Sequence, residues 1–107
     1  MKKWSVEFYE EAQKEFNALD GSQKPQVAKA IQKVSQNPLP NSQGGYGKPL
    51  GNKNANDLTG LLKIKLKRLG LRVVYRLVLE NDAMKIIVIS LRSDSEVYDI
   101  ASKRLKK

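Results

Sequence analysis

The sequence predicts a small α+β domain in which an antiparallel sheet packs against an α-hairpin, in the order β-α-α-β-β-β-α. Three observations carry this prediction. Apolar residues recur at helical spacing between residues 9 and 36, and at alternating spacing between residues 61 and 92. Length is the third observation, because 107 residues are enough for one hydrophobic core but not for two. We therefore expect residues 1–107 to form a single domain.

The first predicted element is a short strand, because Trp4, Val6 and Phe8 alternate with polar neighbours. A helix is expected to follow over Tyr9–Leu19, where apolar residues recur every three or four positions. The turn-forming sequence Asp20-Gly21-Ser22 should end that helix.

A second helix is expected directly after this turn, with Ser22 or Gly21 as its N-cap. Its apolar stripe consists of Val27, Ala30, Ile31 and Val34. The sequence Asn37-Pro38-Leu39-Pro40 should end it, because proline cannot continue the helical hydrogen bonds. Two helices joined by so short a turn predict an α-hairpin.

The segment 41–57 is rich in Gly, Asn, Ser and Pro and is predicted to be the longest loop of the chain. Such a loop is either functional or a tolerated surface insertion, and the sequence leaves both open. Three strands joined by short turns should follow as an antiparallel meander. They are expected at Leu61–Lys67, Leu71–Leu79 and Met84–Arg92. A last helix is expected to begin at the N-cap Ser95 and to continue through Leu105.

The composition is strongly basic. The chain has 20 Lys and Arg against 11 Asp and Glu, a net charge of +9, which favours a nucleic acid as partner over an acidic protein or an anionic membrane. It has no Cys and no His, so the usual metal ligands are missing and we expect neither a metal nor another cofactor. With no apolar stretch long enough to span a bilayer and no signal sequence, a cytoplasmic protein is expected.

Cations are concentrated on the predicted strands. In Lys63-Ile64-Lys65-Leu66-Lys67-Arg68, charged and aliphatic residues alternate, which places Lys63 and Lys65 on one strand face. Arg72 follows on the next strand and Tyr98 on the last helix, so this face is a candidate for binding phosphate. Two other interpretations stay open: the lysines protect a strand edge from aggregation, and Tyr98 is a packed core residue.

Several of these segments together resemble the RelE/ParE superfamily of bacterial type II toxins, and most closely its RelE-type members. The segments that carry the resemblance are Lys48-Pro49-Leu50-Gly51, Leu62-Lys63-Ile64-Lys65-Leu66, Gly70-Leu71-Arg72-Val73-Val74-Tyr75, and Arg92 with the following Ser95-Glu96-Val97-Tyr98. The resemblance implies a microbial ribonuclease-like fold and an endoribonuclease that cleaves mRNA in the ribosomal A site. It also implies an acidic antitoxin as partner, in a hetero-oligomer.

Carried over position by position, the resemblance implies a catalytic set of Lys63, Lys65, Arg72, Arg92 and Tyr98. RNA is cleaved when its 2′-OH attacks the adjacent phosphorus, which requires a proton acceptor, a proton donor and neutralisation of the transition-state charge. Without histidine, Tyr98 and Lys65 are the candidates for the general base. Arg72 has a planar fork suited to two phosphoryl oxygens, Arg92 could share that role, and Lys63 would hold backbone phosphate.

Two further functions remain possible at this point. The chain could be a ParE-like toxin that binds DNA gyrase without chemistry of its own, or a basic RNA-binding module. Neither of these requires the combination of strand lysines with Arg92 and Tyr98, so the combination favours the nuclease.

Overall fold

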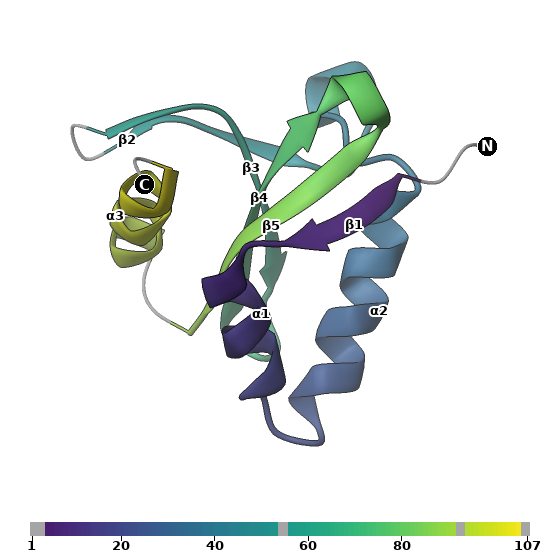
Figure 1. The fold of residues 1–107 in the computed structure, drawn as a ribbon, viewed down its shortest axis with the longest axis vertical. Helices are drawn as coiled ribbons and strands as arrows, with labels where there is room; N and C mark the ends of the chain where they lie inside the picture. Colours follow the sequence, from purple (N-terminus) through teal and green to yellow (C-terminus); the bar gives the residue numbers. More distant parts are fainter. Residues whose placement is uncertain (1–3, 54–55, 92–93, 106–107) are drawn as a thin grey trace.

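The computed structural model describes residues 4–53, 56–91 and 94–105, which form a five-stranded sheet with helices on both faces (Figure 1). The elements are β1 (Ser5–Phe8), α1 (Glu10–Asn17), α2 (Gln23–Ser35), β2 (Lys48–Lys53), β3 (Asn56–Leu66), β4 (Leu71–Val78), β5 (Ala83–Ser90) and α3 (Asp94–Leu105). Two short 3₁₀ helices lie at Asn41–Gln43 and Leu79–Asn81. The α+β class and the α-hairpin are therefore confirmed. Within the described ranges, no helix is long and apolar enough to cross a membrane.

The strand order is β1-β5-β4-β3-β2. The structure corrects several details of the sequence prediction. The segment 41–57 is not one loop, since it contains β2, and β3 begins at Asn56 instead of Leu61. β2 pairs antiparallel with β3, while β1 pairs parallel with β5 at the far end of the sheet. The last helix begins at Asp94, ahead of the predicted cap Ser95.

Each face of the sheet has its own apolar core. The face covered by α1 and α2 buries the larger cluster, which includes Val27, Ile31, Tyr75 and Ile86. The opposite face packs against α3 through the second cluster, which includes Leu50, Leu61, Val74, Val88, Val97, Tyr98 and Ala101. Figure 1 shows the two groups of helices on opposite sides of the sheet. The predicted apolar stripe of α2 is thus confirmed at Val27, Ile31 and Val34.

The turn between α1 and α2 is held by Asp20. Its Oδ1 accepts hydrogen bonds from the backbone N–H of Ser22 and Gln23 and from the Ser22 hydroxyl, at 2.7–2.9 Å. The hydroxyl and amide donors lower the pKa of this exposed carboxyl. Asp20 therefore caps α2, whereas the predicted cap Ser22 makes no side-chain cap bond.

The loop between α2 and β2 is anchored to the core by Tyr75. The phenol of this fully buried tyrosine donates a 2.8 Å hydrogen bond to the carbonyl of Pro38. Gly47 packs against the same phenol so closely that a Cβ at this position would collide with it. The loop is also closed on itself, because Asn41 N–H donates to Gly47 O at 2.7 Å. Tyr75 is therefore a core residue.

Tyr75→Phe is expected to destabilise the fold by about 1–3 kcal/mol, because it leaves the Pro38 carbonyl without its donor. Burial also raises the pKa of Tyr75, so the folded chain keeps this proton where an unfolded tyrosine, with a pKa of about 10, loses it. The contribution of Tyr75 to stability is therefore complete below pH 10 and falls as the pH rises further.

Urea denaturation of the wild type and of Tyr75→Phe, at pH 7 and at about pH 11, would check this pH dependence. The stability difference between the wild type and Tyr75→Phe should shrink at the higher pH, since only the wild type loses stability through ionisation of this group. A difference that is the same at both pH values would contradict the assignment.

Candidate functional site

The site lies on the face of the sheet that α3 partly covers. Along β3, Leu62 and Leu66 contribute to the core under α1 and α2, while Leu61 packs toward α3. Because side chains alternate along a strand, Lys63 and Lys65 must point to the same side as Leu61. Lys63 is half-buried next to α3, and Lys65 is exposed.

Arg72 joins this face from β4. It lies directly opposite Lys65 in the antiparallel register of β3 and β4, and opposite Ser90 in the register of β4 and β5. Directly opposed residues have Cβ atoms about 4.5–5.5 Å apart, so two cationic side chains rise from neighbouring strands. This pair can hold an anionic group between a guanidinium and an ammonium.

Tyr98 completes the site from α3. Its hydroxyl accepts a 2.8 Å hydrogen bond from Lys63 Nζ, which also lies 5.5 Å from the centre of the ring. The ring is only 5% exposed and packs in the apolar cluster between α3 and the sheet. The interpretation of Tyr98 as a packed core residue is confirmed, and its hydroxyl lies beside the predicted site residue Lys63.

α3 is tied to the rest of the fold by an ion pair at its other end. Arg104 donates from Nη1 and Nη2 to the two carboxylate oxygens of Glu15 on α1, at 2.8 and 3.0 Å. Arg104 Nη1 also donates to the carbonyl of Ile87 at 2.7 Å, and Glu15 accepts the N–H of Ile89 at 3.0 Å. These bonds fall beside the irregular register between β4 and β5. We call Glu15 and Arg104 the α3 tether.

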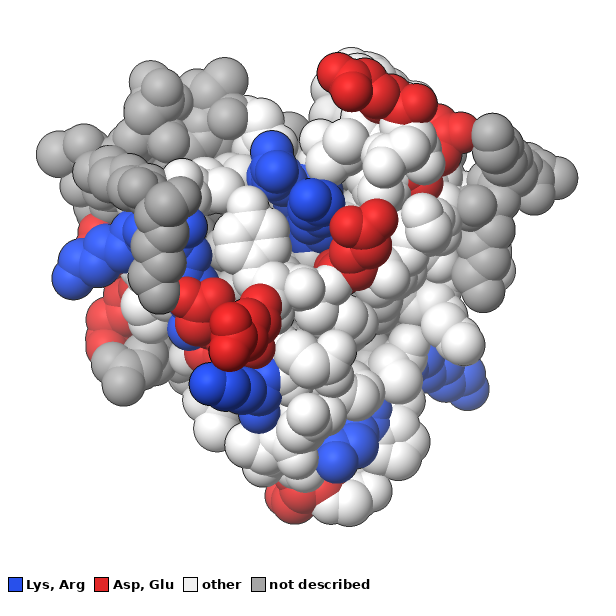
Figure 2. Space-filling view, in the orientation of Figure 1, with Lys and Arg blue, Asp and Glu red and all other residues white. Residues whose placement is uncertain are grey.

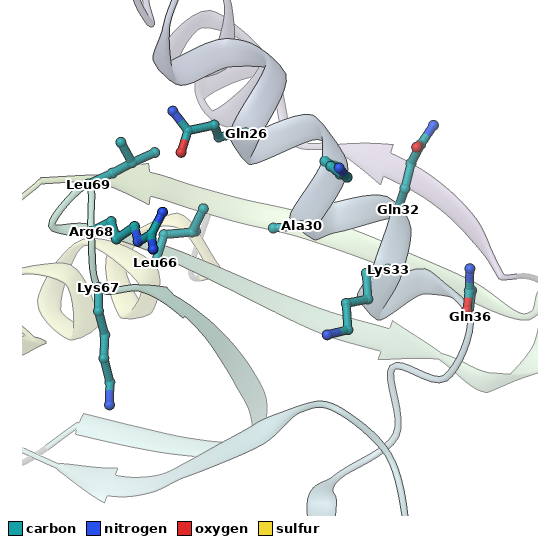
Figure 3. Close-up of a pocket in the computed structure, with 10 residues that line it drawn as sticks. Gln26, Ala30, Gln32, Lys33, Gln36, Leu66, Lys67, Arg68 and Leu69 are labelled. Carbon is teal, nitrogen blue, oxygen red and sulfur yellow. The ribbon is translucent and has the colours of Figure 1, made fainter.

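Two hollows with basic walls adjoin the site. The smaller, about 220 Å³, lies at the edge of β3 beyond its pairing with β2. It is lined by Ala30, Lys33, Val34, Tyr46, Lys48, Lys63, Ile64 and Lys65. The larger, about 740 Å³, lies between α2 and the turn after β3, and Lys33 of α2 faces it together with Lys67 and Arg68 (Figure 3). Lys33 lines both hollows, so they are neighbours along α2.

The positive charge is not spread evenly over the molecule. On the face seen in Figure 2, basic side chains are interspersed with acidic ones. By contrast, no acidic residue lines either of the two hollows among the described residues. Anions are therefore favoured at the open edge of β3.

The structure brings together four of the five predicted site residues, namely Lys63, Lys65, Arg72 and Tyr98. Arg92 lies outside the described residues. Sequence reasoning missed the α3 tether and the position of Tyr46. No spacing rule could have found the tether, since its two residues are 89 positions apart.

Comparison with known proteins gives consistent results. No protein-family model matches the chain. It is 32% identical over 105 residues to a RelE-like toxin protein of Escherichia coli, covering 97% of this chain and 99% of that one. It is 31% identical over 103 residues to the mRNA interferase toxin RelE of Escherichia coli strain K12, covering 94% and 95%. Among solved structures, an E. coli RelE mutant in complex with a peptide of its antitoxin matches with a TM-score of 0.65, 27% identity and coverage of 94% and 95%.

Proposed function

The chain belongs to the RelE family of toxins, and from this premise we propose that it is an endoribonuclease that cleaves translated mRNA on the ribosome. The observation that carries the proposal is the contact between Lys63 and Tyr98 beside the opposed pair of Lys65 and Arg72. A protein that only binds a partner has no need for a buried phenol held by an ammonium group next to two further cations. The relatives named RelE and mRNA interferase support the same activity.

The reaction assigned to the site is attack of a ribose 2′-OH on the adjacent phosphorus. The bond from O2′ to phosphorus forms and the bond from phosphorus to O5′ breaks. The general base takes the proton of the 2′-OH, and a solvent water gives a proton to O5′. Arg72 holds two phosphoryl oxygens through its planar fork and neutralises the charge that develops on them. Lys63 adds positive charge and is itself oriented by Tyr98.

Lys65 and Tyr98 are the two candidates for the general base, and they differ in how exposed their side chains are. Lys65 is exposed on β3, so RNA can reach its side-chain nitrogen directly, and this nitrogen accepts a proton when it is a neutral amine. Tyr98 is 5% exposed, so its hydroxyl is reached only beside Lys63. We therefore assign proton removal to Lys65 and assign to Tyr98 the positioning of Lys63.

An antitoxin is the proposed partner, because the solved structure of the E. coli relative contains an antitoxin peptide, and we expect the partner of this chain to be acidic. A chain with a net charge of +9 and a cationic catalytic face offers such a partner an electrostatic target. Inhibition follows if the partner covers Lys63, Lys65 and Arg72, or if it displaces α3 and with it Tyr98. We place this activity in the cytoplasm, where ribosomes translate mRNA.

The products of cleavage test the proposed chemistry. RNA fragments from ribosome-bound mRNA should carry a 2′,3′-cyclic phosphate on one side of the cut and a 5′-OH on the other. Mass spectrometry of the fragments checks both ends. Naked mRNA should be cut slowly, because a flexible strand does not hold its 2′-OH in line with the leaving oxygen. Fragments ending in 3′-OH and 5′-phosphate would contradict the mechanism, since they require water as the nucleophile.

A further inference from the structure

Tyr46 is an aromatic side chain that the catalytic set does not use. Its relative exposure is 49%, and it forms part of the wall of the 220 Å³ hollow that also contains Lys63 and Lys65. The other large apolar residues exposed in the described part of the chain, Leu79 and Leu91, are aliphatic and do not line this hollow. A half-exposed ring beside a cationic strand edge has a flat surface available to a ligand.

The backbone around Tyr46 is held in place by close packing and by hydrogen bonds. Gly45 packs so tightly against the carbonyl of Leu39 that a Cβ at this position would collide with it. A Cβ at Gly47 would likewise collide with the phenol of Tyr75. Tyr46 N–H donates to Asn37 O at 3.0 Å, and Gly47 N–H donates to Leu39 O at 3.1 Å. The residue between the two close-packed glycines therefore has a fixed backbone, which lowers the entropic cost of presenting its ring to a ligand.

The charges around the ring indicate which ligand it suits. Lys33 Nζ lies 5.5 Å from the centre of the Tyr46 ring, and Lys48 lies opposite Lys63 in the register of β2 and β3. Together with Lys65, these residues make four lysines among the residues that line the hollow, and no acidic residue is among its described walls. A ligand that matches this wall has both a flat π-surface and repeated negative charges. Single-stranded RNA has both, because its bases are unpaired and can unstack from their neighbours to stack on an aromatic ring.

We propose that Tyr46 is a stacking platform for a base that flanks the scissile phosphate of a single-stranded RNA. The base lies on the Tyr46 ring, and Lys33 and Lys48 contact the neighbouring phosphate. The strand then passes Lys63 and Lys65 to reach Arg72. This inference rests on the proposed function, whose substrate it places along the edge of β3. It gives the loop before β2 a role in binding RNA and sets the direction from which the substrate enters.

A binding experiment with the full chain tests the platform without cleavage. The probe is a short single-stranded RNA with 2′-O-methyl groups, which cannot be cut, and with a fluorescent 2-aminopurine base at each position in turn. In the wild type, the fluorescence of 2-aminopurine at one position should be quenched because that base stacks on the Tyr46 ring. Tyr46→Ala should abolish that quenching and weaken binding roughly tenfold or more, as expected for loss of one stacked base. Tyr46→Phe keeps the ring and should bind within about twofold of the wild type.

Leu79→Ala is the matched control, because it removes another exposed apolar side chain outside the hollow and should change neither signal. Circular dichroism confirms that each variant is folded. Equal quenching and affinity in Tyr46→Ala and the wild type would overturn the platform, as would failure of the wild type to bind the probe.

Single-turnover cleavage on ribosomes provides a second readout. In Tyr46→Ala, the half-saturating toxin concentration should rise about tenfold while the maximal rate is unchanged, because the catalytic residues remain in place. A lower maximal rate with no change in the half-saturating concentration would overturn a binding role. If the wild type binds and quenches the probe but never cleaves mRNA, the platform stands and the proposed nuclease function fails.

Discussion

Arg72→Ala is expected to slow cleavage of ribosome-bound mRNA about 100- to 1000-fold, the usual effect of removing one transition-state contact. Tyr98→Phe is expected to slow it as well, because it removes the group that positions Lys63. Arg72 lies opposite Lys65, where its fork can bind two phosphoryl oxygens. Removing the Tyr98 hydroxyl leaves Lys63 Nζ without this 2.8 Å partner, so the ammonium group loses its orientation. The fold should survive both changes, because the Tyr98 ring stays in its apolar cluster and Arg72 is not part of either cluster.

Single-turnover rates beside circular dichroism and thermal melting would check these variants. Lys14→Ala is a suitable control, since it removes a cation from an exposed position on α1 and should leave the rate unchanged. Lys65→Ala adds a test of the general base, because a chain without its base should lose most of its cleavage rate. If Arg72→Ala and Tyr98→Phe both cleave at the wild-type rate, the catalytic site lies elsewhere.

Arg104→Gln is expected to loosen α3 and to reduce both stability and cleavage. Arg104 makes two hydrogen bonds to Glu15 and one to the carbonyl of Ile87, and its side chain is only 15% exposed. Breaking a fully buried ion pair costs about 3–5 kcal/mol. Because the Glu15 side chain is 28% exposed, the expected loss of stability is smaller, about 1–3 kcal/mol. Because α3 positions Tyr98, the maximal cleavage rate should fall about tenfold or more even at temperatures where the chain is folded.

Hydrogen exchange separates loosening of α3 from global unfolding. In Arg104→Gln, amides of α3 should exchange faster than in the wild type, while amides of β4 and β5 keep their protection. Glu15→Gln is the milder comparison, because its amide oxygen can still accept the N–H of Ile89. Unchanged exchange along α3 would mean that the apolar cluster alone holds the helix, and the tether would then have no part in positioning Tyr98.

The elements that the sequence predicted well are those with a clear periodicity. The apolar stripe of α2 and the alternation along β3 and β4 each follow from local spacing, so the shared face of Lys63 and Lys65 follows as well. β2 was missed because Lys48–Lys53 contains glycine, asparagine and proline, which disfavour strands. Its strand geometry comes from pairing with β3, which is a tertiary contact that no local pattern encodes.

The candidate site shows the same division between local and long-range information. The resemblance to RelE-type toxins named Lys63 and Tyr98, but nothing in the spacing placed a lysine 2.8 Å from a phenol 35 positions later. That contact depends on how α3 docks on the sheet. The α3 tether and the fixed backbone of Tyr46 arise in the same way, from packing between segments that are separate in the sequence.

The parallel pairing of β1 with β5 also sets the timing of folding during synthesis. Ser5 bonds to Asp82, 77 positions later, so β1 has no partner until that part of the chain has left the ribosome. At about 5–20 residues per second, this delay lasts roughly 4–15 s. Tyr98 is made later still, on the helix that follows β5. A nascent chain therefore spends seconds without a complete candidate site, and under the proposed function this interval lets an antitoxin already present in the cell bind before the site is assembled.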